Sequence, residues 1–382
     1  MQLIKAHRDA ILRALQIVAG IIERRHTQPI LANVLITRVG DQVSLTGSDS
    51  EIQIRTTAQL APAGSTNDAA SSTTVAARKL LDILRSVPND DLVTVSQTQQ
   101  RLTVAAGRSR FTLQALDASA FPTAQLAADP NNQLEVPQAT LKTLLGQVHY
   151  AMAQQDIRFY LNGLLMLTQG GSVTAVATDA HRLAVATASV GSQADEPNSP
   201  VAEFIIPRKT VLELQRLLAD RNEPVKIDVS ASQARFRFVD DKESEIELVS
   251  KLVEGRFPDW QRVIPQNHDR VMTVNREVFT KTLSRVAILT GEKFRAVHFK
   301  LEAGLLKIQA QNSDQEEATD EIEIEYSGPE LEVGFNVSYL LDCLNNLKSE
   351  SVIIHFGESG SSALLTVPEL EGFRYVVMPV RI

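Results

Sequence analysis

Several features that often reveal a protein's class are scarce in this chain of 382 residues. A single cysteine, Cys343, excludes an internal disulfide framework and a zinc cluster held by thiolates, and we expect a reducing, cytoplasmic setting. Aromatic residues make up only 5% of the chain, so its cores should consist mainly of leucine, valine, isoleucine and alanine. No apolar run reaches the roughly 20 residues of a membrane-spanning helix. The N-terminal stretch MQLIKAHRDAILRAL is expected to form an amphipathic helix rather than a signal peptide.

Positive charge is also in the minority, because 46 acidic residues outnumber 38 basic ones and give a net charge of −8. This balance argues mildly against a basic nucleic-acid-binding protein. Amphipathic helices are predicted at 8–18, 76–86, 138–150, 208–219, 275–289 and 337–347. They carry about +7 in sum, which leaves about −15 for the rest of the chain. If the helices share one surface, it is positive and suits sequence-independent contact with a phosphate backbone. The helical cations are Arg8, Arg13, Arg78, Lys79, Arg85, Lys142, Arg208, Lys209, Arg216, Arg276, Lys281 and Arg285.

A pattern with a period of about 130 residues runs through the chain. An apolar residue, a helix-start signal and an amphipathic helix recur in VAARKLLDIL (75–84), IPRKTVLELQRLL (206–218) and FNVSYLLDCLNNL (335–347). Pro207 is expected near the first turn of its helix, and Asn336 is expected to cap the next one. The period is far longer than a solenoid repeat, so it predicts three similar domains rather than an array of small units.

Each predicted domain contains two helices and several short, alternating strands. Strand-like runs at 29–36, 159–168 and 294–302 each follow an amphipathic helix, and a strand, a polar turn and a second strand come next. Such strands form antiparallel sheets with one buried face. We therefore predict an α+β fold repeated three times. The predicted domains are 1–130, 131–266 and 267–382.

One short stretch, VATDAHRLAVA (176–186), holds Asp179, His181 and Arg182 like parts of a catalytic or metal site. The turn around Asp179 aligns with turns around Asp49 and Asp314 in the other repeats, which indicates a structural Asx turn or cap. His181 and Arg182 lack such counterparts and belong to something specific to the second domain. The H-x-x-x-H, G-x-S-x-G and phosphate-loop spacings of metal, hydrolase and nucleotide sites are absent from the sequence. A satisfied turn histidine is therefore the simplest local interpretation.

A series of longer stretches completes the pattern: VAARK, GRSRFTL, MAQQDIRFYLNG, ATDAHRLAV, IPRK, SKLVEGRFPDW, AILTGEKFRAV, GFNVSYLLD and YVVMPVRI. In these stretches the chain resembles the bacterial DNA polymerase III beta subunit family, the sliding clamps, over essentially its whole length. The resemblance implies three DNA-clamp domains per chain, each with two helices and antiparallel sheets. It also implies a head-to-tail homodimer that forms a ring, with helices lining the hole and sheets forming the outer wall.

The resemblance further implies a processivity factor in DNA replication that is not an enzyme and needs no cofactor or metal. The expected partners are a second copy of the chain, duplex DNA bound without sequence specificity, a clamp loader and the DNA polymerase III alpha subunit. Other polymerases and repair proteins would bind through clamp-binding peptides, and no membrane is involved. Two alternatives stay open: an enzyme that uses Asp179 and His181, and a monomeric scaffold that binds peptides without encircling DNA.

The resemblance assigns three sets of residues by motif. The set for a partner-peptide groove is Leu161, Thr178, Ala180, His181, Arg182, Leu183, Pro258, Arg262, Val263, Asn336, Tyr339, Ser362, Val376, Val377, Met378, Pro379, Val380 and Arg381. The DNA-binding set is Arg25, Arg78, Gln155, Phe159, Tyr160, Arg208 and Lys209. The dimer-interface set is Arg108, Arg110, Phe111, Leu113, Ile288, Leu289, Glu316, Glu317 and Asp320.

Three positions depart from the family pattern. Ala180 stands where glycine is expected, and Val380 stands where methionine is usual. Because Val380 removes a flexible thioether from the groove, we expect peptide preference to shift. Phe159 stands where tyrosine is common, so it keeps an aromatic face without the hydroxyl. A place in a strand core is an equal alternative for Phe159.

Overall fold

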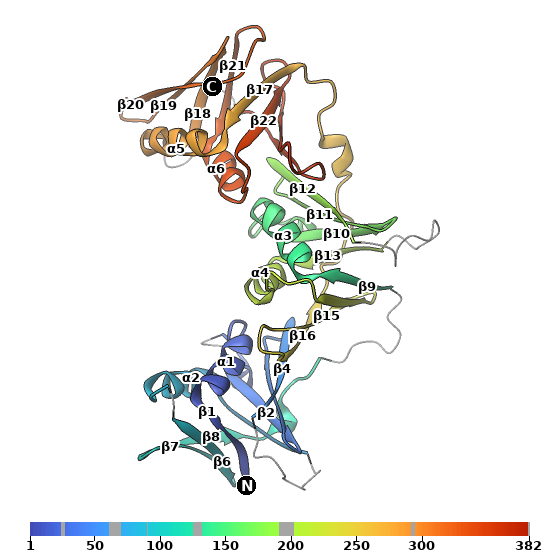
Figure 1. The fold of residues 1–382 in the computed structure, drawn as a ribbon, viewed down its shortest axis with the longest axis vertical. Coiled ribbons are helices and arrows are strands. Elements are labelled where there is room, and N and C mark those ends of the chain that lie inside the picture. Colours follow the sequence, from blue (N-terminus) through green and yellow to red (C-terminus); the bar gives the residue numbers. More distant parts are fainter. Residues whose placement is uncertain are drawn as a thin grey trace. The chain divides into compact units, whose positions relative to one another are not determined.

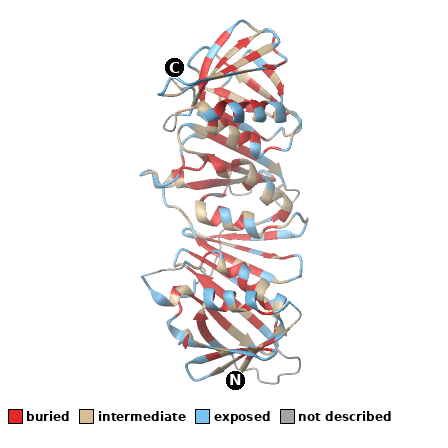
Figure 2. Cartoon of the chain, turned by 90° about the vertical axis from the view of Figure 1, so that its left-hand side faces the viewer, coloured by how far each residue is buried: buried red, intermediate tan, exposed pale blue. Residues whose placement is uncertain are grey.

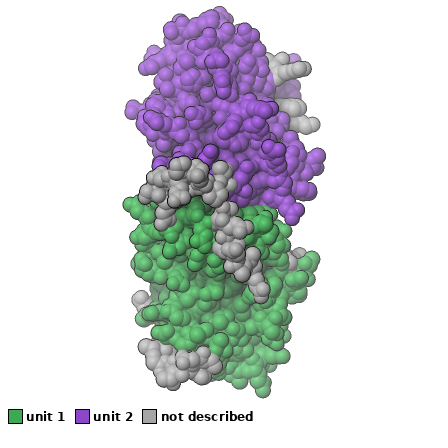
Figure 3. Space-filling view, turned by 90° about the vertical axis from the view of Figure 1, so that its right-hand side faces the viewer, with its two compact units in different colours: residues 1–142, 212–252 green, residues 143–211, 253–382 purple. Residues whose placement is uncertain are grey.

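The computed structural model describes residues 1–23, 27–60, 70–89, 91–124, 132–190, 202–291 and 295–380 (Figure 1). They fall into two compact units (Figure 3). The first unit comprises Met1–Lys142 and Leu212–Leu252, and the second comprises Thr143–Val211 and Val253–Ile382. Each sheet of the structure lies within one unit.

The predicted helices are confirmed, and their ends agree with the prediction to within three residues. They are α1 (Arg8–Ala19), α2 (Ala77–Ser86), α3 (Gln138–Val148), α4 (Arg208–Leu217), α5 (Arg276–Val286) and α6 (Val337–Asn345). α3 and α5 end two and three residues before their predicted ends, at Val148 and Val286. In both cases a 3₁₀ turn continues from the helix, at His149–Ala151 and Ala287–Leu289. The Asn336 side chain caps α6 by accepting the backbone N–H of Ser338.

The sheet of the first unit has the strand order β1-β6-β7-β8-β5-β2-β3-β4-β16-β15-β14-β9. Its strand pairs are antiparallel, as predicted. The strands are β1 (Gln2–His7), β2 (Asn33–Val39), β3 (Gln42–Ser48), β4 (Ile52–Gln59), β5 (Ser71–Ala76), β6 (Leu92–Thr98), β7 (Arg101–Ala106), β8 (Ser109–Leu116), β9 (Asn132–Pro137), β14 (Pro224–Val229), β15 (Gln233–Val239) and β16 (Glu245–Lys251).

The second unit contains two sheets, which are also antiparallel. Their strand orders are β13-β10-β11-β12-β24-β23-β22-β17 and β20-β19-β18-β21, and α5 and α6 lie side by side (Figure 1). The strands are β10 (Gly163–Gln169), β11 (Ser172–Thr178), β12 (Arg182–Ser189), β13 (Ala202–Pro207), β17 (Arg270–Asn275), β18 (Ala296–Glu302), β19 (Leu305–Gln311), β20 (Glu317–Glu323), β21 (Leu331–Asn336), β22 (Ser351–Phe356), β23 (Ala363–Thr366) and β24 (Arg374–Val377).

The core is mainly aliphatic, as the composition predicts. α1, for example, buries Ile11 and Leu15 on the face that its amphipathic pattern marks. The C-terminal part adds a row of phenylalanines, in which Phe279, Phe299 and Phe335 meet edge to face at centroid distances of 5.9 and 5.5 Å. Figure 2 shows buried and exposed residues alternating along many strands, which is the pattern of sheets with one buried face.

Two strand pairs join successive repeats of the chain. Joint one is the pairing of β4 with β16, from Ile52↔Ser250 to Thr57↔Glu245. Joint two is the pairing of β12 with β24, from Arg182↔Val377 to Val185↔Arg374. Because these pairings make continuous sheets across the repeats, the compact units cut through the repeat pattern. The boundaries 1–130, 131–266 and 267–382 therefore stay a prediction.

The polar turns of the repeat confirm the Asx interpretation in two places and correct it in the third. Asp49 Oδ1 accepts the backbone N–H groups of residues 51 and 52, and Asp179 Oδ1 accepts those of 181 and 182. In the third repeat Asn312, not Asp314, has this role, because its Oδ1 accepts the N–H groups of Asp314 and Glu316. The expectation for Asp314 was wrong because the side chain that accepts these N–H groups stands two residues earlier, at Asn312.

Candidate functional site

The turn between β11 and β12 holds Asp179, His181 and Arg182 in a fixed conformation. Asp179 accepts two backbone N–H groups at 2.9 and 3.0 Å, and Thr178 Oγ1 donates to the carbonyl of Arg182 at 2.6 Å. Ala180 stands at the tip with φ of 74°, in the left-handed region that favours glycine. This explains why the family pattern has glycine at this position.

Arg182 points inward rather than toward solvent. Its side chain is 9% exposed, and each of its nitrogens donates a hydrogen bond. Nε donates to Asp179 at 3.0 Å, Nη1 to Asp342 at 2.6 Å and Nη2 to the carbonyl of Tyr150 at 2.7 Å. The guanidinium carbon lies 4.5 Å from the centroid of the Tyr339 ring. Arg182 therefore ties the turn to α6, with each guanidinium nitrogen already bonded inside the protein.

The partners of Arg182 were not found by sequence analysis. Asp342 lies 160 positions away in sequence, and no local pattern shows which helix packs on the turn. Burial alone would lower the pKa of Arg182, but Tyr375 and the nearby carboxylates raise it above its ordinary value. Tyr375 is itself buried and donates its hydroxyl to the carbonyl of Tyr339 at 2.8 Å. Together these groups form a polar cluster inside the second unit.

Three segments meet around the predicted groove residues. The β11–β12 turn supplies His181, whose ring stacks on Tyr339 of α6 at a centroid distance of 6.4 Å and an interplanar angle of 19°. The C-terminal segment supplies Met378, which is 42% exposed and whose backbone N–H donates to the carbonyl of His181 at 2.9 Å. Val380 donates its N–H to Gly334 at 2.9 Å. Residues Arg381 and Ile382 lie outside the described residues.

Some predicted groove residues lie in the core rather than on the surface. Leu161, Leu183, Val376 and Val377 are each 1% exposed. Leu183 and Val376 belong to an apolar cluster against which further hydrophobic side chains pack. Sequence analysis named one of these side chains, Tyr160, but as a DNA-binding residue, and it named none of the others. The apolar spacing of WQRVI (260–264) could have indicated Trp260 and Ile264. The side chains packed against the cluster are Tyr160, Leu167, Val253, Trp260, Ile264 and Leu364.

The remaining predicted groove residues lie nearer the surface. Pro258 and Val263 are exposed, the latter by 39%, and the Arg262 side chain is 86% exposed. Arg262 Nε lies 2.8 Å from Asp259, as an ion pair one helical turn apart. Ser362 is half-buried just before β23. Pro379 is half-buried in the C-terminal segment.

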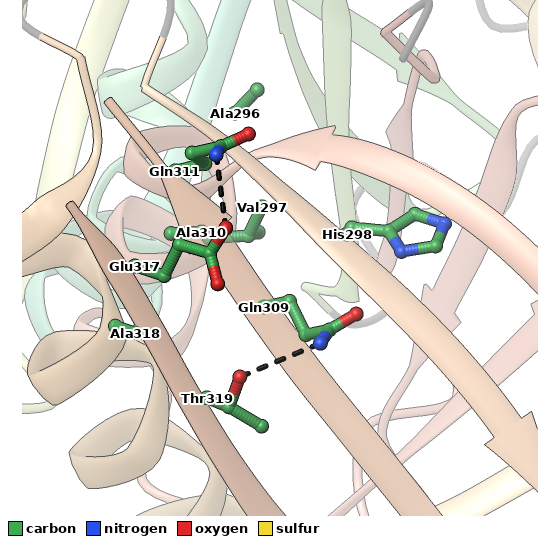
Figure 4. Close-up of a pocket in the computed structure, with 9 residues that line it drawn as sticks. All are labelled: Ala296, Val297, His298, Gln309, Ala310, Gln311, Glu317, Ala318 and Thr319. Carbon is green, nitrogen blue, oxygen red and sulfur yellow. Dashed lines mark hydrogen bonds between the residues drawn. The ribbon is translucent and has the colours of Figure 1, made fainter. Parts of the chain in front are cut away.

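Two hollows among the described residues lie elsewhere. One, of about 370 Å³, lies on β18, β19 and β20 and is lined by polar side chains such as His298, Gln309 and Gln311 (Figure 4). In it Gln311 donates to Glu317 at 2.9 Å. The other, of about 440 Å³, lies on β4, β14, β15 and β16 and is lined by charges of both signs, including Arg55. Neither contains a predicted peptide residue.

The predicted DNA-binding residues are distributed over both units, and Arg25 lies outside the described residues. Arg78, on α2, has a 58% exposed side chain 3.9 Å from Asp82. Phe159 is 72% exposed, so the core alternative for it is wrong. Tyr160 instead packs against the apolar cluster.

The loop before Phe159 is held by its own polar groups. Hydrogen bonds from Arg158 lower the pKa of Asp156 to about 2. Gln155 is exposed there with φ of 57°. Arg208 Nη1 donates to the carbonyl of Met152 at 3.3 Å, so this cation reaches the same loop. Lys209, next on α4, is half-buried.

Several helical cations are engaged inside the protein. Arg13 donates to Asp240 at 3.0 Å, and Arg216 donates to the carbonyl of Ile17 at 2.7 Å. Arg276 donates to the carbonyl of Ser349 at 2.7 Å. The sum of helical charge therefore overstates the positive charge that these helices offer to a partner.

The predicted dimer-interface residues lie on β8, on β20, in the turns before these strands and in the 3₁₀ turn after α5. Arg108 and Arg110 are exposed on β8 and in the turn before it, while Phe111 and Leu113 are half-buried. Ile288 is 77% exposed, and Leu289 beside it is half-buried. Glu316 and Glu317 are exposed at the start of β20. Asp320 accepts a hydrogen bond from Arg285 of its own chain at 2.7 Å.

Within the described ranges, no group of three or more histidine, cysteine, aspartate or glutamate side chains is arranged to hold a metal ion. A separate finding concerns the helices: none of those described is long and apolar enough to cross a membrane.

Comparison with known proteins gives matches along the whole chain. Family models of the DNA polymerase III beta subunit match residues 1–125 (N-terminal domain), 135–259 (central domain) and 261–381 (C-terminal domain). The chain is 43% identical over 375 residues to the beta sliding clamp of Pseudomonas aeruginosa and 39% identical over 377 residues to that of Escherichia coli K12. Each alignment covers 98% of both proteins.

Solved structures agree with this result. The DNA polymerase III subunit beta from P. aeruginosa is similar with a TM-score of 0.91 and 42% identity over 100% of both chains. The same values hold for a P. aeruginosa sliding clamp bound to griselimycin. Identity at this level over the full length of both chains exceeds what a shared fold alone would give. The chain therefore belongs to the DNA polymerase III beta subunit family, the beta sliding clamps.

Proposed function

We propose that this protein is a non-enzymatic sliding clamp for DNA replication, working in the cytoplasm. Two copies would pair head to tail into a ring around duplex DNA and tether the replicative polymerase to it. The observation that carries the ring is the repeated use of one kind of strand pairing. β4 and β12 occupy the same place in their repeats, and so do β16 and β24.

The corresponding strands of the remaining repeats are β20 and β8. Among the described residues, β20 pairs only with β19, and β8 meets β5 only through Thr74↔Leu116 and Val75↔Ala115. Pairing β20 of one copy with β8 of a second would repeat joints one and two; we call this the subunit joint. Two such joints would close a dimer and cover both open strand edges.

The internal joints also indicate the register of the subunit joint. Arg55↔Glu247 in joint one and Val185↔Arg374 in joint two occupy the same repeat position. Transferred to the third pair, this register places Arg110 opposite Thr319 of the second copy and Thr112 opposite Glu317. Arg110 would then lie diagonally between acidic side chains, which favours this orientation.

The test is a pair of cysteine substitutions in the full-length chain. Thr112→Cys combined with Glu317→Cys should form a disulfide between copies under mild oxidation, seen as a covalent dimer by denaturing electrophoresis. Thr112→Cys combined with Thr319→Cys is the control for a register shifted by two residues and should crosslink far less. Sedimentation of the unmodified chain should show a dimer at micromolar concentration. A monomer there would contradict the ring and favour the monomeric scaffold.

Retention on DNA should depend on topology rather than charge. Phosphate contacts by residues such as Arg78 and Lys209 weaken steeply with salt, whereas a closed ring cannot leave a closed circle. Once loaded by a clamp-loader ATPase, the protein should stay on nicked circular DNA in moderately high salt, and a single restriction cut should release it. Gel filtration before and after the cut measures this. Equal retention on circular and open linear DNA would contradict encirclement.

Partner proteins would bind through peptides at the predicted groove. Support comes from the meeting of the β11–β12 turn, the start of α6 and the C-terminal segment around an apolar cluster. The DNA polymerase III alpha subunit, other polymerases, repair proteins and the clamp loader are the proposed partners. Deleting residues 378–382 should abolish binding of a Q-L-x-L-F peptide while the dimer persists. Affinity within about twofold of wild type would contradict the groove.

A further inference from the structure

We propose that Asp342 is a positioning residue for peptide binding, which acts through Arg182 to fix the two sides of the predicted groove relative to each other. One side is the β11–β12 turn with Ala180 and His181; the other is the start of α6 with Tyr339. The inference rests on the proposed peptide groove, and it concerns a residue that would not itself contact the peptide.

The first argument is the geometry of Arg182. Its guanidinium bonds Asp179 within the turn and Asp342 within α6, at 3.0 and 2.6 Å. Tyr339, three residues before Asp342, lies against the same guanidinium at 4.5 Å from its centroid. One buried cation thus contacts both sides at once. Because its third nitrogen is bonded to the carbonyl of Tyr150, it cannot turn toward a ligand without breaking a bond.

The second argument is that joint two does not need this cation to hold its strands. In joint one the position of Arg182 is occupied by Ile52, which is 2% exposed. The adjoining backbone bond is the same, since Lys251 donates to Glu51 at 2.9 Å as Met378 donates to His181. An aliphatic side chain therefore suffices for strand pairing at this position. The ion pair with Asp342 serves some further purpose at joint two, where the predicted groove lies.

The third argument is the exposure of Asp342. Its side chain is 45% exposed, while that of Arg182 is 9% exposed. Removing the carboxylate leaves Arg182 bonded to Asp179 and Tyr150, so the protein should still fold. What is lost is the ion pair with α6, which leaves the Tyr339 ring as the contact between Arg182 and this helix. The helix can then shift against the turn. A peptide that contacts both must hold them in place on binding, which reduces its free energy of binding.

The experiment compares three variants of the full-length chain. Asp342→Ala removes the bond, and Asp342→Glu restores a carboxylate at the same place. Glu277→Ala is the matched control, because it removes an acid that pairs with Lys281 on α5, away from the groove residues. The probe is a Q-L-x-L-F peptide with alanine at x. Its affinity is measured by isothermal titration calorimetry, alongside the thermal unfolding temperature of each variant.

Hydrogen exchange gives a readout that a general loss of stability would not reproduce. The Met378 amide bonds the carbonyl of His181 and so reports on the contact between the two sides. In Asp342→Ala this amide should exchange faster, while amides of β10 and β11 keep their wild-type rates. Peptide affinity should fall about tenfold with little change in unfolding temperature, and Asp342→Glu should recover most of it.

The outcomes separate this inference from the groove on which it rests. If the tail deletion abolishes binding but Asp342→Ala binds like wild type and like Glu277→Ala, the groove stands and the positioning role is wrong. If Asp342→Ala speeds exchange in β10 and β11 as much as at Met378, Asp342 is a general stabilising residue and the inference is overturned. If wild type binds no peptide at all, both proposals fail.

Discussion

Joint one and joint two share their backbone hydrogen bonding and differ in the side chains around it. In joint one the first paired residue of β4 is the buried Ile52. In joint two the corresponding residue of β12 is Arg182, whose side chain bonds to Asp342 of α6. The helices are tied differently too. In joint one Arg216 of α4 donates to the carbonyls of Gln16 and Ile17 in the last turn of α1. The comparison teaches that strand pairing is the constant part of the repeat, while each joint's side chains adapt it to a particular use.

In joint one a glycine, Gly20, lies directly beside this contact. A Cβ added to Gly20 would lie 2.7 Å from Arg216 Nη2 and from a carboxylate oxygen of Glu213, so the ends of these two flexible side chains would have to shift. A cation at a helix C-terminus is favourable because the last carbonyls lack helical partners. At the same repeat position after α5 stands Ile288, which is 77% exposed. The subunit joint would thus be apolar where joint one is polar.

The largest expected effect tests that contrast. Replacing Ile288 and Leu289 with alanine should weaken the dimer by about 2–4 kcal/mol, roughly 30- to 1,000-fold in dissociation constant, because apolar burial should dominate the subunit joint. Val278→Ala is the control, since Val278 is also exposed, by 48%, on α5. Sedimentation equilibrium near the wild-type dissociation constant measures the change. A double variant as dimeric as wild type would show that the interface lies elsewhere.

A smaller effect is expected from the arginine of joint one. Arg216→Ala should lower the free energy of unfolding by about 1–2 kcal/mol, because it leaves two carbonyls of α1 without their donors. Arg85→Ala is the matched control: it occupies the same position in α2, and among the described residues it has no ion-pair partner. Denaturant unfolding of both variants gives the values. Equal losses for the two would mean that capping of α1 contributes nothing.

The turns that precede the joints should respond alike to glycine. Ser50 and Ala180 have φ of 78° and 74°, where a side chain is strained. Ser50→Gly and Ala180→Gly should each raise the free energy of unfolding by about 0.5–1 kcal/mol, the relief of strain exceeding the added chain entropy. Ala177→Gly, within β11, should instead destabilise. A loss of stability in Ala180→Gly, measured by thermal unfolding, would show that this conformation is not strained.

The smallest effect is a pH dependence that comes from a histidine of the second unit. Burial lowers the pKa of His149, which follows α3 and contacts the carbonyls of Leu145 and Gly146. Because the folded state disfavours its protonated form, stability should fall as pH drops through the unfolded value near 6.5. His149→Gln should reduce the loss of stability between pH 7 and 5, because glutamine does not take up a proton. An unchanged pH profile would assign the loss to other groups.

The sequence predicted what depends on local pattern. Helix positions follow from amphipathic spacing and caps such as Asn336, and the Asx turns at Asp49 and Asp179 follow from their own residues. It did not predict that Arg182 would turn inward, because the acceptor on α6 comes together with it only in the folded chain. It also counted Arg216 as surface charge, although Arg216 donates to the backbone carbonyl of Ile17. Because every residue has a backbone carbonyl, the sequence gives no sign of such a partner.

The strand pairing shared by the joints has a consequence for where a ring would open. Joints one and two connect parts of one chain, so each closes at a high effective concentration that dilution of the protein cannot change. The subunit joint would connect separate molecules and would close only as their bulk concentration allows. Identical backbone geometry would then give unequal lifetimes. A dimer would separate between β8 and β20 long before either internal joint opened. The connectivity of the chain alone would therefore determine where the ring opens.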